Sequence, residues 1–427
     1  MVWVLLAFAV LLVIGMPVAF AIGIAGTVFF LLNPYLPATI PVQRTVSQTQ
    51  NFALLAVPLF IMAGNYMNRS GITTRLLGLA SILTGRFKGG LAQVSLALSG
   101  LMGGVSGSAI ADAAMQARML GAEMIERGFA RGFTAGVLSF GAVLTPIIPP
   151  GIGMILYGTI GQVSIGRLFA AGIVPALLLW LGLAAAVWLT ARARGYRPER
   201  TERASAREIG RGLAGGIWAI LFPVFLLLGL RSGVFTPSEI GAFAVIYALV
   251  VGLAIYRELG RHGFVEALEG SLSDIGSVMF LIALSAIFSY SIVFERVPET
   301  VAGWVTDATG SLYGVMVLIA LVMVVVGFFV DATVLIIMLT PIFLPVVERL
   351  GGDPVHFGIV FIVAATIGNF TPPVGAAMYA VCSILKCPIG EYTRESVLLF
   401  GAVVATTLAL IFLPSIVLFL PNLVFGG

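Results

Sequence analysis

Eleven long apolar runs fill most of this chain of 427 residues, and several of them contain Gly, Pro or Asp near the middle. A helix needs about 20 apolar residues to cross a bilayer, so these runs predict an all-α integral membrane protein. Only 10% of the residues are charged, which excludes a soluble enzyme, a disordered chain and a nucleic-acid binder. The runs cover residues 1–32, 52–67, 91–119, 129–161, 168–190, 213–230, 240–256, 275–294, 313–347, 357–385 and 397–420.

The breaks inside the longest runs predict helices that do not cross the membrane in one piece. Unpaired backbone at membrane depth survives only where protein or water covers it, so such breaks mark the protein interior. We expect re-entrant hairpins over residues 91–120 and 313–347, and Pro-broken helices over residues 129–161 and 357–385.

The basic residues predict the orientation of the chain. If both hairpins return to the face that they entered, 18 of the 23 Lys and Arg residues lie on one face. The positive-inside rule assigns that face to the cytoplasm. It includes the linker 191–212, whose seven arginines set the topology, and both termini then lie outside. The outer face holds Arg44, Arg167, Arg231, Arg296 and Arg349.

Two halves of the chain, residues 1–190 and 213–427, resemble each other on either side of that linker. Pro17, Asp112 and Pro149 recur as Pro237, Asp331 and Pro372, at shifts of 220, 219 and 223 residues. The halves also share the order of their elements and enter the membrane from opposite faces. Two inverted-topology repeats are the plan of secondary transporters, whose sites form where broken helices of both repeats meet.

Two aspartates lie deep within apolar runs, Asp112 in the first half and Asp331 in the second. A charge at the bilayer centre costs about 3 kcal/mol or more, so both are functional candidates. The alternative is a structural role, in which each aspartate caps the second helix of its own hairpin.

The hairpin tips and proline breaks supply the oxygen ligands that a hard cation such as sodium requires. No Lys or Arg lies deep in any run, so an anionic substrate would depend on helix N-termini and on co-bound cations. The candidate sodium- and substrate-binding residues of the first half are Ser106, Gly107, Ser108, Asp112, Thr145, Pro149, Pro150 and Gly151. Those of the second half are Gly327, Asp331, Thr333, Asn369, Thr371, Pro372, Pro373 and Gly375.

Other polar groups are interpreted as structural or solvated. Cys382 and Cys387 have no histidine nearby, so small semi-buried residues explain them better than a zinc site. His262 and His356 are predicted to lie in solvated loops. The alternating charges of residues 257–274 predict a helix on the cytoplasmic surface.

At these motifs the sequence resembles the large membrane subunit of the tripartite ATP-independent periplasmic (TRAP) transporters, the DctM-type family. The likeness covers nearly the whole chain. It rests on residues 57–64, 67–71, 106–112, 146–150 and 157–158 in the first half, and on residues 235–239, 353–358 and 371–375 in the second.

The resemblance implies a sodium-driven importer of an organic acid, such as a C4-dicarboxylate or sialic acid, with an elevator mechanism and no enzymatic activity. It implies three partners besides the lipid bilayer: a small four-helix membrane subunit, a periplasmic substrate-binding protein and the organic acid. Sodium is the co-transported ion and no organic cofactor is expected. The location implied is the cytoplasmic (inner) membrane of a bacterium or archaeon.

Carried over by motif, Ser106, Ser108 and Pro150 match the surroundings of a first sodium site. A second site would involve Asp331, Thr333 and Thr371. The chain departs from the family pattern after Ala114, where Gln116 and Arg118 either reshape the end of the hairpin or contact a lipid or partner.

Two other functions are weighed against this one. A self-sufficient sodium/carboxylate symporter of similar architecture would transport without a binding protein. An intramembrane aspartyl protease would use both aspartates, but neither Asp112 nor Asp331 has the Gly-x-Gly-Asp setting expected of one, and the paired prolines would stay unexplained.

Overall fold

Helices are the one kind of regular element in the described part of the chain. The computed structural model describes residues 2–200 and 202–426, apart from the side chains of residues 305–309. The first half contains α1 (Val2–Val13), α2 (Val18–Leu32), α3 (Ile40–Thr49), η1 (Phe52–Leu55), α4 (Ala56–Arg69), α5 (Ile72–Thr84), α6 (Leu91–Ser106), α7 (Ala109–Met119), α8 (Gly121–Glu126), α9 (Arg131–Gly141), η2 (Ala142–Ile147), α10 (Ile152–Ile160) and α11 (Ile165–Arg194).

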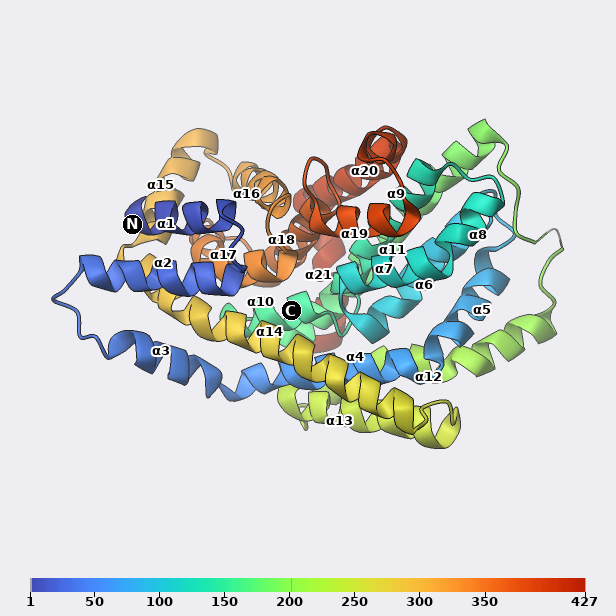
Figure 1. The fold of residues 1–427 in the computed structure, drawn as a ribbon, viewed down its shortest axis with the longest axis horizontal. Helices are drawn as coiled ribbons and strands as arrows, with labels where there is room; N and C mark the ends of the chain where they lie inside the picture. The colour runs from blue at the N-terminus through green and yellow to red at the C-terminus, as the bar shows by residue number, and fades with distance from the viewer. Residues whose placement is uncertain (1, 201, 427) are drawn as a thin grey trace.

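The second half, like the first, contains a helix pair followed by an interrupted helix (Figure 1). It contains α12 (Ala206–Arg231), α13 (Pro237–Val250), η3 (Val251–Ile255), α14 (Arg261–Phe294), α15 (Val297–Thr309), α16 (Leu312–Gly327), α17 (Ala332–Arg349), α18 (Pro354–Asn369), α19 (Ala376–Leu385), α20 (Ile389–Phe412) and α21 (Pro414–Phe425).

The length and polarity of these helices are those of a multi-span membrane protein. Six helices in the described ranges are long and apolar enough to cross a membrane, or eight if each of two bent pairs counts as one span. The bent pairs are α3 with η1–α4, at 53°, and α9–η2 with α10, at 43°. Pro146 lies within η2, where its missing N–H interrupts the helical hydrogen bonds.

Two pairs of adjacent helices form tight hairpins. Helices α6 and α7 are joined by Gly107 and Ser108, and α16 and α17 by residues 328–331. Helix α7 has 11 residues and therefore rises about 16 Å, roughly half of the hydrocarbon thickness. These hairpins bring backbone turns into the interior of the molecule.

Glycines allow two helices to touch beside the tip of the second hairpin. A Cβ atom on Gly368 of α18 would stand 2.6 Å from the Cα of Gly327 of α16. No real Cβ atom tolerates that distance, so both positions require a residue without a side chain.

Helix α14 differs from the surface helix predicted for residues 257–274. From Arg261 onward that segment is the N-terminal part of one continuous helix of 34 residues, which crosses the molecule diagonally (Figure 1). The charged residues of this segment do lie on a helix, but that helix continues without a break into the apolar run that follows. The polar N-terminal turns of α14 are therefore continuous with the apolar span and do not form a separate helix.

Both histidines also depart from their prediction, because each lies in a helix. His262 occupies the first turn of α14 and is exposed, as a solvated residue should be. His356 lies in α18 with 3% of its surface exposed, and its Nε2 atom is 2.8 Å from the carbonyl oxygen of Leu410. His356 is thus a buried residue that joins α18 to α20.

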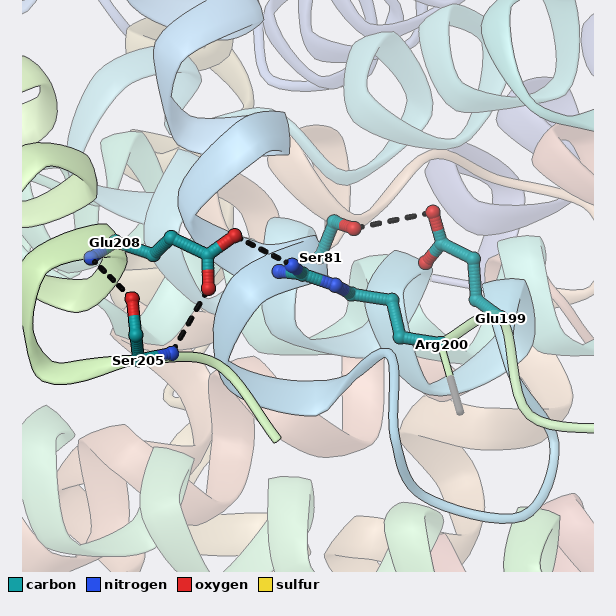
Figure 2. Close-up of polar contacts among 5 residues, drawn as sticks. All are labelled: Ser81, Glu199, Arg200, Ser205 and Glu208. Atoms are coloured by element: carbon teal, nitrogen blue, oxygen red, sulfur yellow. Dashed lines mark hydrogen bonds and ion pairs between the residues drawn. The ribbon is translucent and has the colours of Figure 1, made fainter. Parts of the chain in front are cut away.

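The arginine-rich linker is docked on the loop that follows α5. The backbone N–H groups of Glu199 and Arg200 donate to the carbonyl oxygen of Gly85, at 2.8 and 3.0 Å. The Ser81 hydroxyl donates to the Glu199 carboxylate at 3.0 Å, as Figure 2 shows. These hydrogen bonds fix the path of the linker beside the C-terminal end of α5.

A capping box fixes the point where the linker enters α12. Ser205 and Glu208 exchange hydrogen bonds between side chain and backbone, and Arg200 donates to Glu208 at 2.9 Å (Figure 2). The backbone N–H of Ser205 and the Arg200 guanidinium lower the pKa of Glu208. The charged box therefore persists through the neutral range and weakens only when acid protonates the carboxylate.

Candidate functional site

A cavity of about 270 Å³ lies where the tips of the two hairpins face α14. The first hairpin contributes Ser106, Gly107 and Ser108, and the second contributes Asp331 and Thr333. Asn369, at the end of α18, also lines the cavity. The structure therefore brings together six of the sixteen predicted site residues, drawn from both halves of the chain.

The second hairpin tip is organised by the carboxylate of Asp331. One carboxylate oxygen accepts the backbone N–H of Thr333 at 2.8 Å and so caps α17. The other oxygen accepts the side-chain amide N–H of Asn369 at 3.1 Å. The amide oxygen of Asn369 is buried and has no hydrogen-bond partner. This tip therefore offers one negative charge and one free buried acceptor.

The first hairpin tip presents neutral oxygens. Gly107 has a φ of +61°, which turns the chain between α6 and α7, and the Ser108 hydroxyl accepts the backbone N–H of Ala111 at 3.4 Å. A Cβ atom on Gly107 would lie 3.0 Å from the carbonyl oxygen of Pro150, so that carbonyl stands beside the tip. The Ser106 hydroxyl is buried without a partner. Hydroxyl and carbonyl oxygens of this kind suit a hard cation.

Asp112 is buried away from this cavity, with 1% of its surface exposed. Its carboxylate accepts hydrogen bonds from Ser99 at 2.9 Å, from Thr145 at 3.1 Å and from the amide of Gln116 at 3.0 Å. The carboxylate therefore ties both helices of the first hairpin to η2. The Thr145 hydroxyl is engaged in its hydrogen bond to Asp112, and Thr145 does not line the cavity either.

The predicted equivalence of Asp112 and Asp331 is wrong in three dimensions. Asp331 is the N-cap of α17, whereas the N-cap of α7 is Ser108 and Asp112 lies one turn further along. Ser108 and Asp331 are 223 residues apart, the same shift that relates Pro149 to Pro372. Of the two aspartates, only Asp331 caps a helix. The N-cap at the hairpin tip is a serine, Ser108, in the first half and an aspartate, Asp331, in the second.

The proline breaks lie directly behind the tips and shape them through backbone contacts. The Pro149–Pro150 and Pro372–Pro373 bonds are both cis. A Cβ atom on Gly151 would stand 1.9 Å from the carbonyl oxygen of Pro146, and one on Gly375 would stand 2.5 Å from that of Asn369. Both turns therefore require glycine. The predicted residues that do not line the cavity are Asp112, Thr145, Pro149, Pro150, Gly151, Gly327, Thr371, Pro372, Pro373 and Gly375.

Thr371 is placed next to the second tip but its hydroxyl is already engaged. It donates to the carbonyl oxygen of Ile367 at 2.7 Å and retains its acceptor lone pairs. The Thr371 hydroxyl oxygen can still accept a hydrogen bond, although the residue does not line the cavity.

Four residues of the opposite wall were missed by the sequence reasoning. Asn65 and Asn68 of α4 and Asp274 and Ser277 of α14 line the cavity. Asn65 donates to Asp274 at 3.0 Å, and the amide oxygen of Asn68 is buried without a partner. Asp274 directly precedes the apolar run 275–294. An acidic residue at the end of a membrane span was the sequence feature that could have marked it as a candidate for the site.

The described residues hold no cluster of three or more His, Cys, Asp or Glu side chains that would bind a transition metal. Asp112 and Asp331 also face different surroundings, one a closed network and the other an open cavity. A carboxylate pair for acid–base catalysis is therefore not formed by them.

Hairpins, broken helices and a polar cavity between them define the class of this protein: a multi-span membrane transporter, not an enzyme. The family described as the DctM component of the tripartite ATP-independent periplasmic transporter matches residues 5–416. The chain belongs to this family, whose members are secondary-active organic-acid permeases of TRAP systems.

Two relatives with named substrates and one solved structure are similar over most of the chain. The sialic acid TRAP transporter large permease protein SiaM of Vibrio cholerae is 32% identical, covering 97% of each chain. The C4-dicarboxylate TRAP transporter large permease protein DctM of Pseudomonas aeruginosa is 30% identical, covering 94% of each. The YdaH transporter of Alcanivorax borkumensis, at 17% identity, shares the fold with a TM-score of 0.62 over 90% of this chain and 88% of that one.

Proposed function

We propose that this chain imports a small organic acid together with sodium ions, as the large subunit of a binding-protein-dependent TRAP transporter. The observation that carries the proposal is the cavity at the two hairpin tips, with its unpartnered Ser106 hydroxyl and Asn369 amide oxygen. Buried acceptors without donors are unfavourable unless a cation or water satisfies them. Sodium at the tips would satisfy them and supply the positive charge that a carboxylate needs.

The two sets of candidate sodium ligands remain as the motifs indicated. The first comprises the hydroxyls of Ser106 and Ser108 with the carbonyl of Pro150. The second comprises the side chains of Asp331, Thr333 and Thr371. The oxygen-rich surroundings of both tips support these assignments.

In the proposed elevator mechanism the hairpins and broken helices move as one body against α4 and α14. The two halves act as inverted repeats, residues 1–190 and 213–427, on either side of the linker 191–212. The linker is cytoplasmic and both termini are periplasmic, in the inner membrane. A small four-helix subunit and a periplasmic binding protein complete the system, and the substrate is a C4-dicarboxylate, sialic acid or a related carboxylate.

Reconstitution tests this function directly. This chain, the small subunit and the binding protein should together take up radiolabelled succinate or N-acetylneuraminate only when sodium is present outside the proteoliposomes. Uptake of either acid without a sodium gradient would contradict the coupling. Uptake without the binding protein would instead identify a self-sufficient symporter.

The charge of Asp331 gives the first residue-level prediction. Asp331→Asn keeps a good N-cap for α17 but removes the negative charge, so we expect sodium-dependent uptake to fall at least tenfold with little change in melting temperature. The matched control is Asp353→Asn, because Asp353 caps α18 in the same way and does not line the cavity. Equal uptake by the two variants would exclude Asp331 as a sodium ligand.

A further inference from the structure

A second cavity, of about 400 Å³, lies between α3, α10, α14 and α17. Its polar lining includes Arg44, Gln48, Thr159, Gln162 and Ser289. No Asp or Glu lines it within the described residues. The cavity is therefore polar, carries one positive charge, and has no role in the function proposed above.

The two cavities lie along the same three helices, α10, α14 and α17. On α14, Ser277 lines the hairpin-tip cavity and Ser289 lines the second cavity, about 18 Å further along the helix. On α10, Gly153 lines the hairpin-tip cavity and Thr159 lines the second cavity, about 9 Å further along that helix. On α17 the two cavities are lined by neighbouring turns. Both cavities thus lie between α14 on one side and α10 with α17 on the other, and this space between the helices is called the cleft below.

Arg44 stands at the end of this cleft that the charge distribution assigns to the outer face. Its Cζ atom lies 4.9 Å from the ring centroid of Tyr290, which is itself stacked on Phe30. In the described part of the chain Arg44 forms no ion pair. A guanidinium that rests on an aromatic face keeps its N–H donors free at its edge, where a carboxylate binds with two parallel hydrogen bonds.

Among the described residues that line either cavity, Arg44 is the one cation, whereas the hairpin-tip cavity contains Asp274 and Asp331. We propose that Arg44 recruits small organic carboxylates at the outer mouth of the cleft, before they reach the hairpin tips. This inference rests on the proposed transport of a carboxylate. A single charge in a cleft with low-dielectric walls raises the local concentration of anions and lowers that of cations.

A charged-probe experiment tests the inference without knowledge of the substrate. Ser289→Cys, in a Cys382→Ser and Cys387→Ser background, reports on the cavity through its rates of reaction with anionic MTSES and cationic MTSET. Arg44→Gln should lower the ratio of anionic to cationic rate about fivefold at low salt, and Arg44→Lys should preserve it. A ratio unchanged by Arg44→Gln would overturn the proposal. The control reporter is Ser232→Cys, whose ratio should not depend on residue 44.

Lipid headgroups are the competing source of anions, and the membrane composition separates the two. In nanodiscs of neutral lipid and in nanodiscs with anionic lipid, the Arg44-dependent ratio should be similar if the guanidinium faces the cleft. Loss of the Arg44 effect in anionic lipid would assign the arginine to headgroups and overturn the proposal.

Transport kinetics give a second test in proteoliposomes. Arg44→Gln should raise KM for succinate or N-acetylneuraminate more than it lowers kcat. If neither acid is transported, the proposed function is contradicted. The ratio of labelling rates does not depend on transport and still decides whether Arg44 attracts anions.

Discussion

At the scale of single residues, the two intramembrane aspartates serve different purposes. Asp331 is half-buried and lines a cavity, whereas Asp112 is enclosed by Ser99, Thr145 and Gln116. Gln116 itself receives a hydrogen bond from Ser95 at 2.9 Å, which extends the network along the hairpin. Gln116, where the chain departs from the family pattern, is therefore explained by its hydrogen bonds to Ser95 and Asp112 inside the protein. Arg118 is exposed.

The network around Asp112 predicts a stability effect. Asp112→Leu leaves the buried hydroxyls of Ser99 and Thr145 without their acceptor, while the Gln116 amide keeps the Ser99 hydroxyl. Each lost acceptor costs about 1–3 kcal/mol, so we expect the free energy of unfolding to fall by about 2–6 kcal/mol. Asp112→Asn should have a smaller effect because it retains one oxygen acceptor. Thermal unfolding in detergent, followed by tryptophan fluorescence, measures both. Arg118→Ala on the same helix is the control, and equal melting temperatures for all variants would refute the bracing role.

At the scale of elements, close backbone contacts decide where helices meet. Gly64 of α4 is an example, because a Cβ atom there would lie 2.8 Å from the carbonyl oxygen of Val105 at the end of α6. Gly368 and Gly327 make the same kind of contact between α18 and α16. Such contacts position the hairpins against both their own broken helices and the opposite wall of the cavity.

The contact of α16 with α18 yields a prediction for Gly368→Ala. The added Cβ must displace the backbone of Gly327, so we expect a loss of about 1–3 kcal/mol of stability. Gly401→Ala in α20 is the matched control, since its Cβ would meet nothing within 4 Å and alanine favours a helix by about 1 kcal/mol over glycine. Calorimetric melting of both variants checks the difference, and a neutral Gly368→Ala would show that the helices can separate freely.

The docked linker gives a second prediction at this scale. Gly90 has a φ of +42°, and its Cβ would stand 2.8 Å from the carbonyl oxygen of Arg197. Gly90→Ala should release the linker and increase trypsin cleavage at its arginines severalfold. Gly210→Ala, with nothing within 4 Å of its Cβ, should leave the cleavage rate unchanged. Equal rates in the two variants would contradict a docked linker.

At the scale of the whole molecule, charge is segregated along the long axis. Helices α5 and α8 and the start of α12 lie toward one end, and α3 and α15 lie toward the other (Figure 1). Eight of the 23 Lys and Arg residues belong to the first group of elements or to the linker 191–212, whereas α3 and α15 together contain one, Arg44. The cleft described above opens near α3, at the end that is poor in basic residues.

Cysteine labelling tests this orientation across a single helix. Glu202→Cys and Ser232→Cys flank α12 and are both exposed. In intact spheroplasts a membrane-impermeant maleimide should label Ser232→Cys at once and Glu202→Cys only after lysis. The reverse order would place the arginine-rich linker outside and invert the proposed topology.

The sequence by itself determined the class of the protein, because apolar run length and proline breaks act locally on whether a helix spans, bends or ends. It also indicated breaks near Gly107, Pro150 and Pro373, where helices end and begin in the structure. Only the tertiary structure decided which polar residues share a cavity. Asp274 and Asn68 come from walls distant in sequence, and Asp112 turns inward because Ser99, Gln116 and Thr145 satisfy it. A side chain's direction depends on its partners across helices, and spacing along one helix does not specify them.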